Sequence, residues 1–202
     1  MTAKLSPSYR ILGIDPGSQK TGWGIIDFDP ENRKIVHVDN GVIFLKPGEL
    51  PERVTELSRR LHLVVEEYRP QQAAIEDVFV NKGPRSAITL GQARGAALAT
   101  VGLCGLAAAS YATTRVKSRV AGKGRASKEQ VAESVRLLLG LKEHPFEDAA
   151  DALAVSICHA FSQVEARVKG SLGAEHIASS GRKREKRRDG LAELARQQGK
   201  LK

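Results

Sequence analysis

The sequence predicts an α/β fold: a mixed five-stranded sheet, made of an antiparallel meander plus parallel strands, flanked by helices. Two observations predict it. Over the first 45 residues, short apolar runs alternate with tight-turn signals, which is typical of a meander. From residue 54 onward, apolar residues at helical spacing alternate with further short apolar runs, which favours strand–helix units. The predicted order of elements is βββαβαβαα.

The meander is predicted from two turns. Residues 10–15 (RILGID) are expected to form a short buried strand, and residues 21–28 the strand that returns beside it. Between them, residues 15–18 (DPGS) predict a type II turn, because proline suits its second position and glycine its third. A second turn over residues 29–32 leads into a third strand over 34–45.

The later elements follow the change to helical spacing. Apolar residues at 54, 57, 61, 64, 65 and 68 predict a helix that ends before Pro70. Ser127 and Gln130 predict a capping box at the start of a helix that ends near Gly140. The other predicted elements are a strand at 73–79, a loop at 81–85, a long Ala- and Gly-rich helix at 85–106, a fifth strand at 111–116 and a last core helix from 147 to about 164.

Charge divides the chain in two. Residues 165–202 carry 11 Lys or Arg against 5 Asp or Glu, whereas the first 164 residues carry 21 and 18. We therefore expect one folded domain over residues 1–166 and a basic, flexible tail over 167–202. The sequence has no run of ~18 apolar residues and no apolar stretch of signal-peptide length before the first strand. We accordingly expect a cytoplasmic protein that does not contact a membrane.

Four carboxylates stand out by their positions. Asp15 ends an otherwise apolar strand, and Pro16 favours an extended backbone at Asp15. Glu76 interrupts a second apolar strand. Asp148 and Asp151 are three residues apart on an otherwise apolar helix, so they share one helical face. Each acid taken singly is explained by capping, pairing or contact with solvent, and Asp148 also by the helix dipole.

Taken together, the four carboxylates favour a metal site. Charges on apolar elements are costly unless they are paired or bind a metal, and carboxylates that lie close together repel each other. Mg²⁺ or Mn²⁺ removes that repulsion, and two such ions about 4 Å apart can clamp the attacking and leaving oxygens of a phosphodiester. Neighbouring Asp77 is expected to face away from the four and to meet a basic residue or water.

Other kinds of site find no support in the sequence. The five histidines show no zinc-ligand spacing. The sequence has no phosphate-binding loop of the P-loop or dinucleotide type, and no serine in a nucleophile-elbow pattern. From Arg115 to Lys128, however, there are six basic residues and no acidic one, with Gly122 and Gly124 in what we expect to be a loop. Such a run suits contact with two DNA backbones, and a solvated loop is the equally common alternative.

Five sequence blocks, in order over residues 9–160, resemble the RuvC-type Holliday-junction resolvases. The blocks are GIDPGSQKTGWG at 13–24, AIEDVFV at 74–80, LGQARG at 90–95, VKSRVAGKGRASKEQV at 116–131 and DAADALA at 148–154. One such block is a weak signal, whereas five in the same order and spacing are highly specific. The tail beyond residue 167 has no counterpart in the resemblance.

The resemblance implies an RNase H-like fold and a crossover junction endodeoxyribonuclease that acts in DNA recombination and repair. It implies a homodimer that makes symmetrical, Mg²⁺-dependent nicks in four-way junction DNA, in partnership with a RuvA–RuvB branch-migration complex. It makes Asp15, Glu76, Asp148 and Asp151 the catalytic ligands of two Mg²⁺ ions per active site, with Mn²⁺ able to substitute.

The resemblance also implies DNA contacts. It makes Phe79 a wedge or stacking residue at the junction, although an aromatic there could equally cover an edge of the core. It makes Lys117 and Lys128 contacts to phosphate near the cut. The same basic run supplies three further expected DNA-binding residues, Arg119, Lys123 and Arg125.

Two alternatives remain open at the level of sequence. The first is an actin-like ATPase or sugar kinase, whose phosphate hairpin also opens on an Asp-x-Gly-Ser pattern, but 202 residues leave no room for a second lobe. The second is a binding module without catalysis, which would hold nucleic acid through the basic tail and loop. That alternative gives no reason for carboxylates on three apolar elements.

Overall fold

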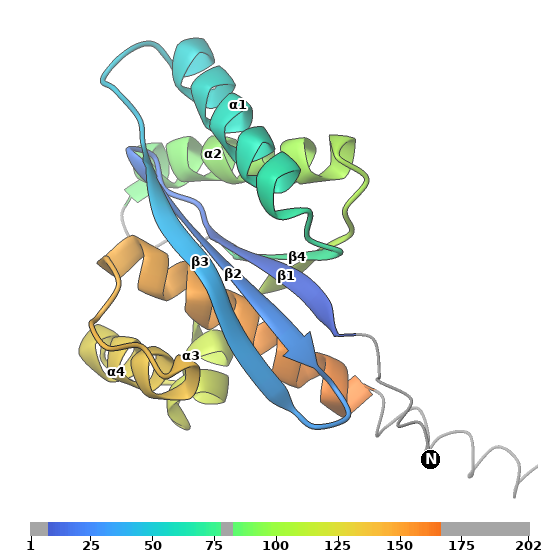
Figure 1. Ribbon diagram of the computed structural model, residues 1–202. Helices are drawn as coiled ribbons and strands as arrows, with labels where there is room; N and C mark the ends of the chain where they lie inside the picture. Colours follow the sequence, from blue (N-terminus) through green and yellow to red (C-terminus); the bar gives the residue numbers. More distant parts are fainter. Residues whose placement is uncertain (1–7, 78–82, 167–202) are drawn as a thin grey trace, which may run out of the picture. The chain divides into compact units, whose positions relative to one another are not determined.

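The computed structural model describes residues 8–77 and 83–166, and within them five strands form one mixed sheet in the order β3-β2-β1-β4-β5 (Figure 1). The strands are β1 (Tyr9–Asp15), β2 (Lys20–Asp29), β3 (Lys34–Phe44), β4 (Gln72–Glu76) and β5 (Ala108–Tyr111). The β1–β2 and β2–β3 pairs are antiparallel, and the β1–β4 and β4–β5 pairs are parallel. The predicted fold class is therefore confirmed.

Helices cover both faces of the sheet (Figure 1). They are α1 (Leu50–Tyr68), α2 (Gly83–Leu103), α3 (Thr113–Ala121), α4 (Lys128–Leu139) and a helix over 147–166. On one face, buried residues of α1 and α2 join Leu12 and Ile14 of β1 in the main apolar core. The helix over 147–166 lies against the other face, on the same side as α3 and α4 (Figure 1).

The chain divides into two compact units. Residues 1–162 hold the sheet and its helices, and residues 163–202 form the second unit, of which residues 163–166 are described and are helical. Within the described part of the chain, no helix is both long and apolar enough to cross a membrane. The predicted capping box is confirmed, since Ser127 Oγ accepts a hydrogen bond from the Gln130 N–H and the Gln130 side chain accepts one from the Ser127 N–H.

The prediction of a fifth strand over 111–116 is wrong in its position. The strand ends at Tyr111, and α3 begins at Thr113. Thr113 and Val116 are β-branched, which favoured a strand, but Val116 and Val120 are four residues apart and both buried, so they form the inner face of a helix. Up to residue 166, three helices instead of two therefore follow β5, and the first half of the basic run is helical where a loop was predicted.

The link between β1 and β2 is not the predicted type II turn. Such a turn requires a positive φ at its third position, and Gly17 does not adopt one. Gly17 is required for space instead, because a Cβ there would stand 1.9 Å from the carbonyl oxygen of Lys20. The Gly17 N–H donates a hydrogen bond of 3.3 Å to Thr21 Oγ1, which holds the two ends of the link together.

Glycines on β1 and β2 let the helix over 147–166 lie directly on the strand backbone. A Cβ on Gly22 would stand 1.8 Å from the backbone oxygen of Asp148, and one on Gly13 would stand 2.1 Å from that of Ala152. A Cβ on Gly24 would stand 2.7 Å from the Leu153 side chain and 2.9 Å from the Leu153 backbone nitrogen. These contacts fix the height of the helix above the sheet and the position of the acidic residues that it carries.

We expect Gly22→Ala to destabilise the fold, because the added methyl group overlaps the Asp148 carbonyl and must push the helix away from the sheet. Overpacking of this kind costs about 1–3 kcal/mol, or roughly 2–10 °C in melting temperature for a domain of this size. Gly102→Ala is the matched control, since nothing lies within 4 Å of a Cβ there. Thermal melts in which the two variants unfold together would contradict the packing argument.

Candidate active site

Four of the sequence-predicted residues meet at one edge of the sheet. Because β1 and β4 are parallel and adjacent, Asp15 and Glu76 end neighbouring strands at the same edge. Asp15 also pairs with Gly22 of β2, and the backbone of Asp148 lies directly over Gly22. The helix over 147–166 thereby brings Asp148 and Asp151 to the ends of β1 and β4.

A cleft of about 650 Å³ opens at this edge. Its walls come from the ends of β1 and β4, the start of α2, the start of α3, the α3–α4 link, α4 and the helix over 147–166. Its charged lining residues are Asp15, Glu76, Asp77, Asp151, Lys117 and Lys128. The cleft thus combines carboxylates from three elements with two lysines.

The neighbouring carboxylates are close enough to change the protonation of Asp15. Burial raises the pKa of Asp15 well above its ordinary value, and the charge of Glu76, a hydrogen bond to Glu76 and the charges of Asp151 and Asp148 raise it further. Burial also raises the pKa of Asp151, while Lys128 lowers it. Asp148 does not line the cleft, but its charge acts on Asp15. The fold therefore brings all four predicted carboxylates into one electrostatic cluster.

The two lysines of the cleft are held in place. Lys128 Nζ lies 2.5 Å from Glu147 Oε1 and 3.5 Å from Asp151 Oδ2, and the hydrogen bond to Glu147 is the largest cause of its raised pKa. Lys117 Nζ donates a hydrogen bond of 2.8 Å to the carbonyl oxygen of Ala126. Both lysines present positive charge beside the carboxylates, as expected for groups that bind phosphate.

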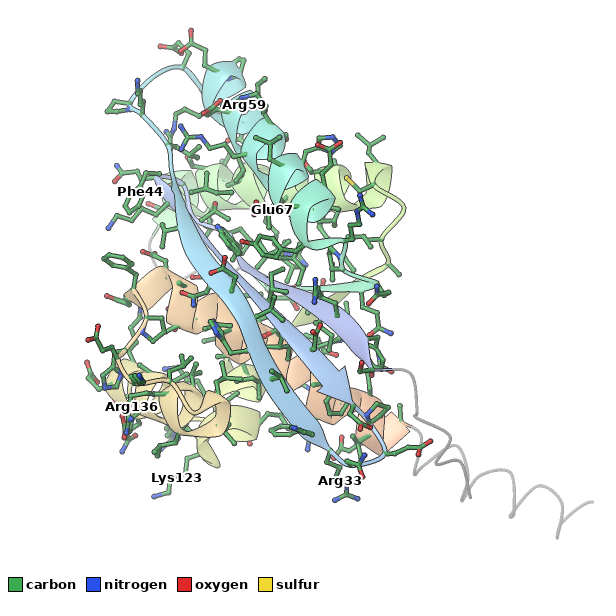
Figure 2. All side chains as sticks on the ribbon, in the orientation of Figure 1. Arg33, Phe44, Arg59, Glu67, Lys123 and Arg136 are labelled. Atoms are coloured by element: carbon green, nitrogen blue, oxygen red, sulfur yellow. The ribbon has the colours of Figure 1, made fainter. Side chains whose placement is uncertain are left out.

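The other expected DNA-binding residues do not share this position. Arg119, Lys123 and Arg125 are not among the described residues that line the cleft. Lys123 and Arg125 are exposed on the link between α3 and α4, where Figure 2 labels Lys123 at the molecular surface. Phe79 lies outside the described residues.

Arg94 and Glu147 belong to the site and were not singled out by the sequence analysis. Arg94 of α2 donates to the backbone oxygen of Glu76 at 3.1 Å and to Asp77 Oδ1 at 2.6 Å, so it fixes the end of β4. The prediction that Asp77 meets a basic residue is confirmed. The expectation that it faces away from the other acids is wrong, since Asp77 lines the same cleft as Asp15, Glu76 and Asp151. Arg94 lies inside the LGQARG block, and Glu147 directly precedes Asp148. The sequence therefore marked both positions, but it did not indicate that Arg94 contacts β4 or that Glu147 contacts Lys128.

The donor chemistry of the cluster fits a hard divalent cation. Among the described residues, no three His, Cys, Asp or Glu side chains already form a metal-binding group. Instead, the raised pKa of Asp15, caused by its burial and by the neighbouring Glu76, favours a proton on the Asp15 carboxyl. A proton and a cation relieve the same repulsion, and Mg²⁺ prefers the carboxylate oxygens that gather at this point.

We expect Asp15→Asn to stabilise the protein in the presence of EDTA. The pKa of Asp15 is raised in the folded state, so ionised Asp15 opposes folding and stability is lost as the pH rises through that pKa. An amide removes the buried charge, and the gain is on the order of 1–2 kcal/mol in the free energy of unfolding at neutral pH.

A matched control tests the sign of this effect. Asp27 of β2 receives a hydrogen bond of 2.8 Å from Arg10 Nε, so its carboxylate is paired and not crowded by like charge. Asp27→Asn should therefore leave stability unchanged or lower it slightly, as is usual for partly exposed ion pairs. Urea unfolding in EDTA at pH 7 measures both, and an Asp15→Asn variant less stable than the parent protein would contradict the electrostatic cluster.

Comparison with known proteins agrees with this geometry. The family model described as crossover junction endodeoxyribonuclease RuvC matches residues 11–159. A crossover junction endodeoxyribonuclease RuvC of Geobacter sp. (strain M21) is 48% identical over 162 residues, which cover 79% of this chain and 98% of that protein. The corresponding protein of Methylobacillus flagellatus is 47% identical over 180 residues, which cover 86% of this chain and 94% of that protein.

Solved structures give the same answer. Thermus thermophilus RuvC in complex with a Holliday junction substrate matches with a TM-score of 0.73 and 34% identity, over 78% of this chain and 96% of that chain. The yeast mitochondrial Holliday junction resolvase, at 15% identity and a TM-score of 0.56 over 81% of this chain and 85% of that chain, shares the fold. The chain therefore belongs to the crossover junction endodeoxyribonuclease RuvC family, with the RNase H-like fold and the nuclease activity that define it.

Proposed function

We propose that this chain resolves four-way DNA junctions by paired symmetrical nicks, with Asp15, Glu76, Asp148 and Asp151 as ligands of two divalent cations. The observation that carries the proposal is the electrostatic cluster: three elements deliver carboxylates to one cleft, and each of the other three raises the pKa of Asp15. Half-buried like charges that lie close together are costly, and binding a divalent cation is the chemistry that offsets this cost. Family membership supports a divalent metal in general, and the donor set supports Mg²⁺, with Mn²⁺ able to substitute.

Each part of the cleft has a task in this proposal. Bound cations would supply Lewis-acid stabilisation of the charge that develops on the scissile phosphate. Lys128 and Lys117 line the same cleft, with Lys128 Nζ 3.5 Å from Asp151 Oδ2, where they can hold non-bridging phosphate oxygens and orient the strand. Lys128 Nζ lies 2.5 Å from the Glu147 carboxylate and 3.5 Å from the Asp151 carboxylate. Glu147 is thus the closer partner of Lys128, which leaves Asp151 available to a cation.

Other expected DNA contacts lie further from the chemistry. We propose that Arg119, Lys123 and Arg125 bind DNA backbone beyond the scissile phosphate, and that Phe79 stacks on a nucleotide beside the cut. Phe79→Ala should then slow junction cutting more than it weakens junction binding, with the fold intact. The basic segment over 167–202 is proposed to add affinity without selectivity, so that its removal makes log K less steep in log salt.

Paired cutting implies two active sites related by a two-fold axis, and we propose a homodimer that works with a RuvA–RuvB branch-migration complex. The helix α2 is the proposed dimer interface, since Ile88 is 62% exposed and Leu103 is 90% exposed on it. Sedimentation that finds a monomer at micromolar concentration, both free and on junction DNA, would contradict the dimer. Cytoplasmic location follows as part of the same proposal.

The decisive experiment offers a four-way junction and a matched linear duplex in Mg²⁺ and in EDTA. We expect two symmetrically placed nicks in the junction with Mg²⁺, no cutting in EDTA and no cutting of the duplex. Asp15→Asn should lower the cutting rate by about 10²-fold or more while junction binding persists, because the lysines remain. Cutting by this variant at the parental rate would show that Asp15 is not a metal ligand.

A further inference from the structure

A second cleft, of about 260 Å³, lies where β3 passes into α1. Its lining residues are Leu45, Lys46, Pro47, Gly48, Glu52, Arg53, Glu56 and Arg60. Three of them are cationic and two are anionic, and none belongs to the carboxylate cluster described above. The start of α1 also adds the positive end of the helix dipole.

The two acids of this cleft leave its positive character intact. Glu56 accepts hydrogen bonds from Arg59 and Arg60, which lower its pKa to about 2. Its charge is thus already matched by two guanidinium groups on the same helix, at 2.9 Å for Arg59 Nε. Of the remaining charged lining residues, Glu52 is anionic and Lys46 and Arg53 are cationic, so the cleft has an excess of positive charge.

Arg53 supplies a second observation that points to a ligand. Its Nε is buried, and among the described residues it has no hydrogen-bond partner. A guanidinium N–H with no acceptor is costly, and arginine prefers the paired oxygens of a carboxylate or a phosphate. The cleft thus offers an unsatisfied donor, Arg53 Nε, and more cationic than anionic side chains.

The position of the cleft connects it with the active site. β1 and β3 are both antiparallel to β2, so the end of β3 lies at the same edge of the sheet as Asp15. Asp15 pairs with Gly22 and Gly22 with Val42, which places Val42 about 10 Å from Asp15 across two strand spacings. Lys46 follows four residues later.

The edge between the two clefts is itself suited to DNA. Lys20 Nζ lies 5.7 Å from the ring centroid of Phe44, and Phe44 is 53% exposed. Figure 2 labels Phe44 at the end of β3, where the chain turns toward α1. A cation and an open aromatic ring therefore lie on the path from the carboxylate cluster to the second cleft.

We propose that Lys46, Arg53 and Arg60 seat a backbone phosphate of the strand that is cut, a few nucleotides from the scissile phosphate. The inference rests on the proposed function and deepens it, since it assigns a second anchor on the same strand. Two anchors at fixed separation set the direction of the strand across the carboxylate cluster, which positions the scissile bond.

Junction binding by the full chain, measured at several salt concentrations in Ca²⁺ or EDTA, tests the anchor. Lys46→Ala and Arg53→Gln should each weaken binding about three- to tenfold near 0.1 M salt and reduce the slope of log K against log salt by about 0.9. Arg33→Gln removes the same charge from the exposed β2–β3 turn, where Figure 2 places it far from Phe44, and should leave the slope unchanged. Equal slopes for Lys46→Ala and Arg33→Gln would overturn the proposal.

Neutral methylphosphonate links, placed one at a time along the cut strand, locate the contact. At one position the substitution should weaken binding by the parent protein, and it should have no further effect on Lys46→Ala. Additive losses at every position would overturn the anchor. Lys46 is exposed, so this variant stays informative even if Arg53→Gln unfolds.

A cutting assay and a competition assay distinguish this anchor from failure of the proposed function and from a site for a free anion. At saturating junction and Mg²⁺, Arg33→Gln should cut at the parental single-turnover rate. Loss of cutting by the parent protein itself would count against the proposed function and not against the anchor. Inorganic phosphate at millimolar concentration should not compete with junction DNA more strongly in the parent protein than sulfate does. Selective competition by phosphate would mark a site for a free anion and would overturn the assignment to the DNA backbone.

Discussion

The close contact between one helix and the backbone of two strands is the constraint on which the site depends. The helix over 147–166 sits on Gly13 and Gly22, where its own backbone oxygens approach the strands, and the Leu153 side chain packs over Gly24. A helix spaced by ordinary side chains would lie several ångströms higher above the sheet. At that height, Asp148 and Asp151 could not act on Asp15 across the edge of the sheet. The glycines of the first block therefore allow the helix to pack closely on the sheet, and this packing places Asp148 and Asp151 beside Asp15.

This arrangement places a destabilising cluster on a strongly stabilised frame. Below the carboxylates, Ile11, Ile14, Ile75 and Leu153 are fully buried and hold the sheet and the helix together. Above them, Asp15 keeps a raised pKa because burial and three neighbouring acids oppose its charge. Strain of this kind persists where the surrounding structure over-determines it, and it is typical of functional sites. The fold thus places four carboxylates where they can bind a cation, and their mutual repulsion lowers the stability of the protein.

The sequence sufficed for those parts of the site that depend on periodicity and on the ends of elements. Asp15 and Glu76 were found because each interrupts or ends an apolar strand, and the fold places both at one edge. It did not suffice where the decisive contact is between distant residues. The hydrogen bond from Arg94 to the backbone of β4 joins residues that are distant in sequence. The space that Gly17 leaves for the Lys20 carbonyl oxygen depends on the path of the chain, which no local pattern reveals. At α3, β-branched residues favoured a strand, and burial of Val116 and Val120 decided for a helix.

β1, β3 and β4 run in the same direction, so the arguments made for the carboxylate cluster apply to the whole edge of the sheet where these strands end. Strands that run in one direction end together, so side chains at their carboxyl ends face the same solvent. On this chain the edge carries acids at β1 and β4, and cations at Lys20 and Lys46 on and after the meander strands. Acids suit the bond to be broken, because they recruit metal, whereas cations suit the phosphates on either side. Along this edge, the acids thereby act at the scissile bond and the cations bind the flanking phosphates, and both groups are positioned by one sheet.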